Sequence, residues 1–527
     1  MSPVFRLLLL PSACALLLVS VTAASAQLFD TTPEFLVNSS TALNQAYPDA
    51  ARITGQGYVV VWESENHLTT GDDVYMRVMD NRGAPIGAEL RVNQTLLGAQ
   101  DSSAVAVHPD GQIMVVWEAA GQDGSQDAVI ARLYNTSGVA LTNEFQLNAY
   151  TLLAQDSPAV APAGPGEFIA VWQSTGQDGS SGGIIGRMFR NDGLAVTGEF
   201  IVNTATIGSQ SSPAVASDAN GNFAVVWHSA NQDGSAAGVY GQRFDALGNR
   251  LGSEFRVNTH TLGPQDEADI GMTATGEFVV AWESGSTLLP QDGSAAGAYG
   301  QRFAADGTPL GTEFRANAYT ILNQDDVAVG VDPNSGEFLI SWESVNQDGS
   351  DPGIYGQRYQ ADGVPIGSEF RINRTVANSQ EDPSVIMDGN GSAVVVWQSD
   401  LQDGDLGGIY ARAVCDQIDG DPALGFVCTE PLCNTDGTPC ATGGICCDGT
   451  CTLQSSCAVQ PGDCNLSGAL DAGDPICVVL CLINDPPLVS DCTGGADCNC
   501  TGSIDAGDPV CSVLRLIDGM TADSCIP

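Results

Sequence analysis

Phe223-Ala224-Val225-Val226-Trp227 is one of seven short apolar runs that each end in a Trp. The Trp residues are spaced by 55, 55, 55, 55, 60 and 55 residues, and such a fixed period is typical of a repeat architecture. Each run is too short for a helix and too continuous for a half-exposed strand, so we interpret it as an inner strand covered on both faces. The seven are Trp62, Trp117, Trp172, Trp227, Trp282, Trp342 and Trp397.

Each repeat holds three further strand candidates, which in the fourth repeat are Ser212 to Ser217, Gly238 to Phe244 and Glu254 to Asn258. Turn residues separate them, including a Gly six positions before most of the Trp residues. Four short strands per repeat, seven times over, match the blades of a propeller. We therefore predict a mainly β fold, with a seven-bladed β-propeller over residues 27–413.

The last strand of the repeat occurs once before the first Trp and never after Trp397. We predict that this first copy, Glu34 to Asn38, becomes the outer strand of the seventh blade, because the pairing closes the ring and removes two open sheet edges. A linear solenoid is the competing architecture, and it would have atypical caps at both ends. The other copies are Glu89 to Asn93, Glu144 to Asn148, Glu199 to Asn203, Glu254 to Asn258, Glu313 to Asn317 and Glu369 to Asn373.

Features that all blades share are better explained by the scaffold, since a single ligand usually breaks the symmetry of a ring. A Gln-Asp-Gly sequence follows six of the Trp strands, as at Gln232-Asp233-Gly234. It favours a turn with side-chain hydrogen bonds over a calcium or sugar contact, because isolated Asp residues lack the closely spaced oxygen ligands that Ca²⁺ prefers.

A polar residue follows every Trp. If these residues lie at one mouth of the ring, they form an acidic collar suited to cations or sugar hydroxyls, although an inter-blade hydrogen bond is the favoured interpretation. They are Glu63, Glu118, Gln173, His228, Glu283, Glu343 and Gln398.

Two places break the repeat, and a binding groove could use either of them. They are Glu65-Asn66-His67-Leu68 in the first blade and the insertion Gly285 to Pro290 in the fifth. We interpret His67 and His228 as structural. Paired carboxylates for glycoside hydrolysis stay open, because such residues can be distant in sequence.

The N-terminus and the charge predict an exported protein. Met1 to Ala26 has the Arg, the apolar run and the small-residue end of a signal peptide, with cleavage before Gln27. Without Arg6, 17 Arg face 63 acidic residues and no Lys, a net charge of about −46 that repels nucleic acid and anionic membranes. No later segment has the apolar length of a membrane span. We expect an extracellular or cell-surface location and an acidic surface adapted to salt or to divalent cations.

Sixteen of the 17 Cys residues lie between Cys415 and Cys525. Residues 414–460 hold eight Cys and no His, which favours a module with disulfides over a zinc site.

Residues 461–527 contain a sequence that repeats with a period of 34 residues. Oxygen-bearing side chains occupy positions 1, 3, 5, 9 and 12 of each copy and Gly occupies position 6, which is the ligand order of a twelve-residue calcium loop. A short apolar helix candidate follows each loop. The ligands are Asp463, Asn465, Ser467, Asp471 and Asp474, then Asp497, Asn499, Thr501, Asp505 and Asp508.

This tandem arrangement resembles a type I dockerin, a small α-helical module with Asp at position 12 of each loop. The resemblance implies two bound Ca²⁺ ions, docking to a cohesin-like protein or cell-surface scaffold, and a frequent association with polysaccharide-degrading enzymes. Positions 10 and 11, which help to select the cohesin in that family, are Ala-Gly in both copies, at Ala472-Gly473 and Ala506-Gly507.

The sequence favours a secreted calcium-binding protein whose propeller is a non-catalytic recognition or scaffold domain, with a carbohydrate as one candidate ligand. The alternative is an extracellular polysaccharide-degrading enzyme, either a glycoside hydrolase or a polysaccharide lyase.

Calcium titration of residues 460–527 tests the tail. We expect two Ca²⁺ sites by calorimetry, and both should be lost in the double variant Asp463→Ala, Asp497→Ala, because each Asp is the first ligand of its loop. A module that binds no Ca²⁺ would contradict the interpretation.

Overall fold

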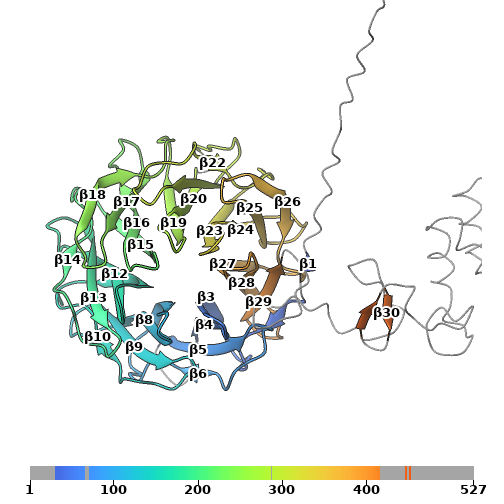
Figure 1. Cartoon of the computed structure of the whole chain (residues 1–527), viewed down its shortest axis with the longest axis horizontal. Helices are drawn as coiled ribbons and strands as arrows, with labels where there is room; N and C mark the ends of the chain where they lie inside the picture. Colours follow the sequence, from blue (N-terminus) through green and yellow to red (C-terminus); the bar gives the residue numbers. More distant parts are fainter. Residues whose placement is uncertain are drawn as a thin grey trace, which may run out of the picture.

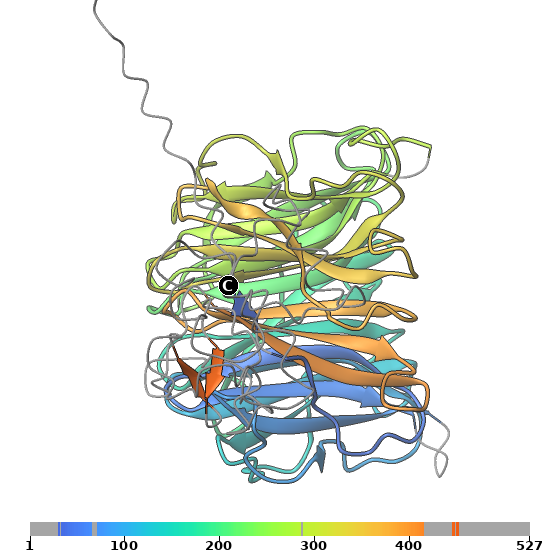
Figure 2. The same cartoon turned by 90° about the vertical axis from the view of Figure 1, so that its right-hand side faces the viewer.

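The computed structural model describes residues 30–31, 33–65, 71–285, 288–415, 445–447 and 450–452. Six four-stranded sheets and one five-stranded sheet stand around a central axis like the blades of a propeller (Figure 1). In the edge-on view, the strands run between the two faces of the ring (Figure 2). The predicted seven-bladed propeller is confirmed.

In blades one to six, the four strands lie in chain order from the axis outward. Blade seven starts in the same way with three strands of its own. Blades one to three are β3 (Gln45–Ile53), β4 (Gly57–Ser64), β5 (Asp73–Asp80), β6 (Leu90–Arg91); β7 (Gln100–Val107), β8 (Gln112–Ala120), β9 (Asp127–Asn135), β10 (Phe145–Gln146); and β11 (Gln155–Pro162), β12 (Glu167–Thr175), β13 (Gly182–Arg190), β14 (Phe200–Ile201). Blades four to six are β15 (Gln210–Ser217), β16 (Phe223–Ala230), β17 (Ala237–Phe244), β18 (Arg250–Arg256); β19 (Gln265–Met272), β20 (Phe278–Ser284), β21 (Gly297–Phe303), β22 (Phe314–Arg315); and β23 (Gln324–Val331), β24 (Phe338–Ser344), β25 (Gly353–Tyr359), β26 (Pro365–Arg371). Blade seven contains β27 (Gln380–Met387), β28 (Ala393–Asp400) and β29 (Gly407–Cys415), and a separate hairpin joins β30 (Ile445–Cys447) to β31 (Thr450–Thr452).

The Trp strand, for example β16, is second from the axis, which agrees with its interpretation as an inner strand, and the innermost strand is the first of each repeat, such as β15. One detail differs from the sequence prediction, the length of the outer strands. The outer strands have two residues in most blades and seven in β18 and β26, where five were predicted. Among the residues that the structure describes, no helix is long and apolar enough to cross a membrane.

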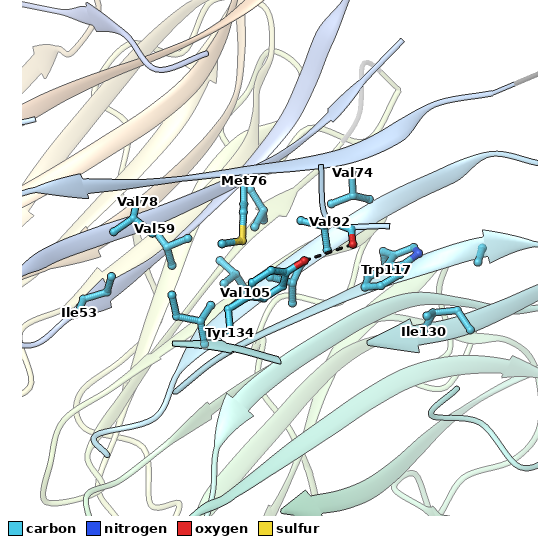
Figure 3. Close-up of a cluster of buried hydrophobic side chains, with 14 of the residues drawn as sticks. Ile53, Val59, Val74, Met76, Val78, Val92, Val105, Trp117, Ile130 and Tyr134 are labelled. Atoms are coloured by element: carbon cyan, nitrogen blue, oxygen red, sulfur yellow. Dashed lines mark hydrogen bonds between the residues drawn. The ribbon is translucent and has the colours of Figure 1, made fainter. Parts of the chain in front are cut away.

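The Trp strands are buried because neighbouring blades cover both of their faces. Every Trp is at most 1% exposed. Between blades one and two, Val59 of β4 and Trp117 of β8 belong to one cluster, and the Tyr134 hydroxyl donates to the Val92 carbonyl at 3.2 Å (Figure 3). A cluster of this kind fills every boundary between blades, so the core is a ring of seven apolar layers.

The N-terminal strand closes the ring, as predicted. Strand β2 (Phe35–Leu36) pairs with β29, and the Val37 N–H donates to the Ile409 carbonyl at 2.7 Å. A further strand that was not predicted, β1 (Asp30–Thr31), also pairs with β29 and extends it to Cys415, two residues past the predicted domain boundary.

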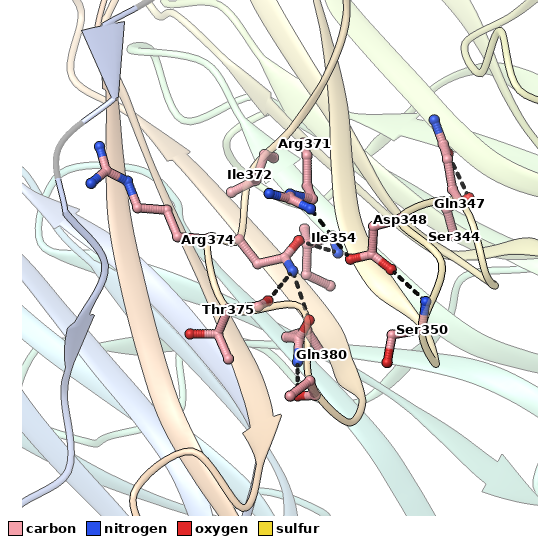
Figure 4. Close-up of polar contacts among 12 residues, drawn as sticks. Ser344, Gln347, Asp348, Ser350, Ile354, Arg371, Ile372, Arg374, Thr375 and Gln380 are labelled. Carbon is pink, nitrogen blue, oxygen red and sulfur yellow. Dashed lines mark hydrogen bonds and ion pairs between the residues drawn. The ribbon is translucent and has the colours of Figure 1, made fainter. Parts of the chain in front are cut away.

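A buried Asn–Gln contact joins consecutive blades. The Asn373 Oδ1 accepts the Ile354 N–H at 2.9 Å, while its Nδ2 donates to the Gln380 Oε1 at 2.6 Å, so one side chain links the end of blade six to the start of blade seven. Ile354 and Gln380, the two partners, are labelled in Figure 4. The same Asn–Gln contact occurs at Asn38–Gln45, Asn148–Gln155, Asn258–Gln265 and Asn317–Gln324.

The Gln-Asp-Gly sequences belong to the same joints, which confirms their interpretation as turns. The Asp348 Oδ1 accepts the Ser350 N–H at 3.1 Å, and the Gln347 Nε2 donates to the Glu369 Oε1 of the outer strand at 2.6 Å. At the closing joint Glu34 has this role, because it accepts the Gln402 Nε2 at 2.8 Å. The ring therefore closes with the contacts that hold its internal joints.

Closure can be tested with a matched pair of variants. Val37 and Val92 occupy the same position in blades seven and one, and both are fully buried. We expect Val37→Ala and Val92→Ala each to lower the free energy of unfolding by about 2 kcal/mol through lost apolar burial and a cavity. The check is chemical denaturation, and a silent Val37→Ala beside a costly Val92→Ala would contradict closure by the N-terminal strand.

Candidate functional site

A β-bulge lies near the start of every innermost strand, where the register with the Trp strand shifts. In each blade a non-Gly residue in the bulge has a φ between 47° and 54°, a left-handed conformation that costs roughly 1–3 kcal/mol per residue. Because this conformation recurs in all seven blades, it belongs to the scaffold, and a function at this face of the ring, here called the mouth, would have to come from the side chains that differ between blades. The seven residues, here called the bulge ring, are Tyr47, Ser102, Ser157, Ser212, Glu267, Asp326 and Asp382.

The side chains of the bulge ring break the symmetry that the backbone keeps. Blades two to four have Ser, blades five to seven have an acid, and blade one has Tyr47. The sequence analysis did not single out these residues. The sequence feature that could have identified them is their position, two residues after the repeated Gln that starts each innermost strand, as Asp326 follows Gln324.

The polar residues that follow each Trp lie beside the bulge ring, so they do form a collar. Each pairs across the sheet with the residue before the bulge, as Glu343 does with Asp325. The inter-blade hydrogen bond that the sequence favoured is also present, since the Glu63 Oε1 accepts the Ser102 N–H of the next blade at 2.5 Å. Glu118 accepts the Ser157 N–H at 3.3 Å.

Blade six departs from this pattern, because its collar residue meets other carboxyl groups. One carboxylate oxygen from each of Asp325, Asp326 and Glu343 lies within 4.8 Å of the other two. Glu343 is 8% exposed, and within the described residues no backbone N–H donates to it as Ser102 donates to Glu63. In the part of the chain that the structure describes, these three form the one acidic group compact enough to hold a metal ion.

Burial and like charge raise the pKa values of Glu343 and Asp325. Burial is the main reason why the pKa of Glu343 rises to about 10, and Asp325 and Asp326 add to the effect. The pKa of Glu283 rises to about 9 through burial and the nearby Glu267. Asp325 rises only to a pKa of about 6, chiefly through burial. At neutral pH the mouth therefore holds protonated Glu343 next to ionised Asp325.

The Arg side chains of the third strands donate hydrogen bonds to neighbouring blades. In blades one to three and seven they reach the preceding blade, as Arg77 does by donating to the Val37 carbonyl at 2.6 Å. In blades four to six the Arg is one position later, which turns it to the opposite face, and Arg243 donates to the Ala305 carbonyl of the following blade at 2.7 Å. Among the described residues, no ion pair includes a member of the bulge ring or the collar.

His228 is the collar residue of blade four. Its Nε2 lies 2.5 Å from the Ser211 Oγ of the paired strand, and burial lowers its pKa, which keeps the ring neutral. Its Nδ1 is buried and has no hydrogen-bond partner, so no acid orients the ring as in a catalytic triad. The interpretation of His228 as structural agrees with this geometry.

The other predicted site residues lie mostly outside the described part of the chain. All ten predicted calcium ligands belong to residues 461–527, so their arrangement remains a prediction. The same holds for Asn66, His67 and Leu68 of the first-blade loop. Of the fifth-blade insertion, Leu288 is described and almost fully exposed.

Comparison with known proteins adds no family. No family model matches the chain, and no curated protein matches it. Among solved structures, a Dyadobacter fermentans protein of unknown function is 10% identical, with 73% of this chain and 98% of that chain covered and a TM-score of 0.45. An α-L-arabinofuranosidase from Fusarium graminearum is 12% identical, with 59% and 92% covered and a TM-score of 0.41. A sialidase from Streptococcus pneumoniae is 8% identical, with 73% and 70% covered and a TM-score of 0.41.

Two of these three proteins are thus named as glycoside hydrolases. Similarity at this level assigns neither a family nor an activity to the chain, and the fold rests on the strand pairing itself.

The raised pKa of Glu343 predicts a pH-dependent stability. The folded state keeps a proton on Glu343 between pH 4.5, its ordinary pKa, and about 10, whereas the unfolded chain releases it, so stability falls as pH rises through this window. Glu343→Gln removes this cost and should raise the free energy of unfolding by about 2 kcal/mol at pH 8, with little change at pH 4.

The control is Glu254→Gln, because Glu254 accepts the Thr204 N–H at 2.5 Å as part of a joint. This variant should be less stable than the wild type at pH 8. Thermal unfolding at both pH values checks both variants, and a Glu343→Gln variant that is destabilised at pH 8 would contradict the raised pKa.

Proposed function

We propose that the propeller is a glycoside hydrolase whose acid and base lie at the mouth of the channel in blade six. The observation that carries the proposal is the pair Glu343 and Asp325, which face each other across β23 and β24 with pKa values of about 10 and 6. Hydrolysis of a glycosidic bond needs one protonated and one ionised carboxyl group positioned next to the bond that breaks. A site that raises the pKa of one carboxyl group much more than that of its neighbour provides such a pair at neutral pH.

The short separation favours a retaining mechanism. Carboxyl groups about 5 Å apart leave no room for a water molecule between them, so the ionised carboxylate acts as the nucleophile. Glu343 gives its proton to the glycosidic oxygen as the C–O bond breaks, and the Asp325 oxygen bonds to the anomeric carbon. Water then attacks the anomeric carbon and releases Asp325. One proton of that water molecule passes to Glu343, which restores its protonated form.

The charge of the mouth limits the substrate. Six further acids lie around the pair in blades five to seven, and a polyanionic glycan would be repelled. A neutral polysaccharide fits, and its hydroxyl groups can donate to the ionised carboxylates. These acids are Asp266, Glu267, Glu283, Asp326, Glu381 and Asp382.

Recognition without turnover, which the sequence favoured, remains the second candidate. The observation that favours it is an arc of exposed aliphatic side chains, each five residues before a member of the bulge ring and so on the same face as the mouth. Exposed apolar side chains that recur on one face can contribute to a binding surface. The arc consists of Leu97, Leu152, Ile207, Leu262 and Ile321. In either case, calcium-dependent docking through residues 461–527 would bring the propeller to its site of action.

A polysaccharide panel separates the two candidates. The purified chain is incubated with neutral glucan, xylan, mannan and arabinan and with anionic polygalacturonate, and both binding and released reducing ends are measured. We expect release from a neutral polymer, lost by about 100-fold or more in Glu343→Gln and in Asp325→Asn.

The matched control is Glu118→Gln in blade two, whose carboxylate serves the Ser157 N–H and which should keep its activity. Binding without release from any polymer would favour recognition. Release that survives Glu343→Gln would contradict the assigned acid.

A further inference from the structure

Tyr47 is an exposed aromatic side chain at the mouth of the channel. Tyr47 is 57% exposed, and it is the only Phe, Tyr or Trp in the described part of the chain that is more than half exposed. Most of the other large aromatic side chains pack between blades, and Tyr150 and Tyr319 are partly buried. Since an isolated exposed aromatic ring gains little from folding, burial does not account for a Tyr at this position.

The backbone of Tyr47 is also unfavourable for so large a side chain. Its φ is 50°, a region that bulky residues rarely adopt, and the same position in blades two to four has Ser. A strained residue whose side chain packs against little of the fold points to a role in ligand contact.

The surroundings of Tyr47 belong to the proposed active site. Asp382 of the neighbouring seventh blade is the largest cause that raises the pKa of its hydroxyl, and Glu63, Glu381 and Asp326 contribute after burial. The hydroxyl therefore stays protonated at neutral pH and lies within the field of the acids that surround Glu343. In the ion pairs that the structure describes, no Arg pairs with Asp382, Glu381, Asp326 or Glu63.

A flat apolar ring next to hydrogen-bonding carboxylates matches the two sides of a sugar. A pyranose presents a C–H face that packs on an aromatic ring and an edge of hydroxyl groups that donates to carboxylates, and ligand sites in general combine aromatic walls with a few polar groups. We infer that Tyr47 is the platform on which a pyranose ring of a neutral polysaccharide stacks, next to the acids of blades six and seven.

This inference rests on the proposed function and narrows its substrate class. The substrate must be an uncharged polymer whose sugars present a flat C–H face, such as a β-linked glucan or xylan. Tyr47 acts in binding and does not take part in proton transfer.

Three variants test the platform: Tyr47→Ala, Tyr47→Phe and, as a matched control in the same bulge position of blade three, Ser157→Ala. Affinity electrophoresis measures binding to each polysaccharide of the panel, and steady-state kinetics measure turnover. We expect Tyr47→Ala to weaken binding and raise KM about tenfold with kcat almost unchanged, because stacking contributes mainly to ground-state binding. Tyr47→Phe keeps the ring and should bind within about twofold of the wild type, as should Ser157→Ala.

The outcomes separate the platform from the hydrolase. A loss of binding in Tyr47→Ala but not in Tyr47→Phe, without release of product by the wild type, supports the platform and overturns the hydrolase. Release by the wild type with a Tyr47→Ala variant that binds normally overturns the platform alone. Equal losses in both Tyr47 variants show that the hydroxyl matters rather than the ring and also overturn the platform. No binding by the wild type to any polymer overturns both, and melting curves establish that each variant is folded.

Discussion

The hydrogen bond from a buried Asn to a buried Gln, which occurs at most of the blade boundaries, is the contact on which the rest of the propeller depends. Between blades one and two, the Asn93 Nδ2 donates to the Asp73 Oδ1 at 2.7 Å instead. At Asn373 and Gln380 the Asn–Gln contact fixes where one blade ends and where the next innermost strand begins, and the bulge follows two residues later. An amide pair buried in this way is costly to disrupt, because each partner would be left without a hydrogen bond. At these boundaries, the position of the mouth residue therefore follows from a contact outside the mouth itself.

A backbone of near seven-fold symmetry carries side chains that are not symmetric, and this difference separates scaffold from function. The joints repeat around most of the ring, including the closing boundary, whereas the bulge ring has Tyr in blade one, Ser in blades two to four and an acid in blades five to seven. The scaffold also forces acids such as Glu343 into positions where ionisation is unfavourable. Natural proteins retain destabilising groups of this kind where activity requires them, and the joints offset their cost.

The fold could be predicted from the sequence because its signals are local and repeated: the Trp spacing, the turn residues and the extra strand at Glu34 to Asn38. The mouth could not, since a left-handed φ at a non-Gly residue has no signature in one sequence, and the convergence of Asp325, Asp326 and Glu343 depends on the register of two strands. The collar was found because it follows each Trp, but the special status of blade six depends on burial. The calcium tail remains a prediction from its loop pattern and its resemblance to dockerins.

The protonation state of the mouth tests the central claim most directly. Carbon-13 NMR of protein labelled at the Glu side-chain carboxyl carbon follows each group through a pH titration, and the spectrum of Glu343→Gln identifies the resonance of Glu343. The account predicts that Glu343 is still protonated at pH 7 and titrates above it, because burial and the adjacent Asp325 and Asp326 disfavour its charge. A Glu343 resonance that titrates near pH 4.5, as in an unfolded chain, would contradict the acid–base pair in blade six.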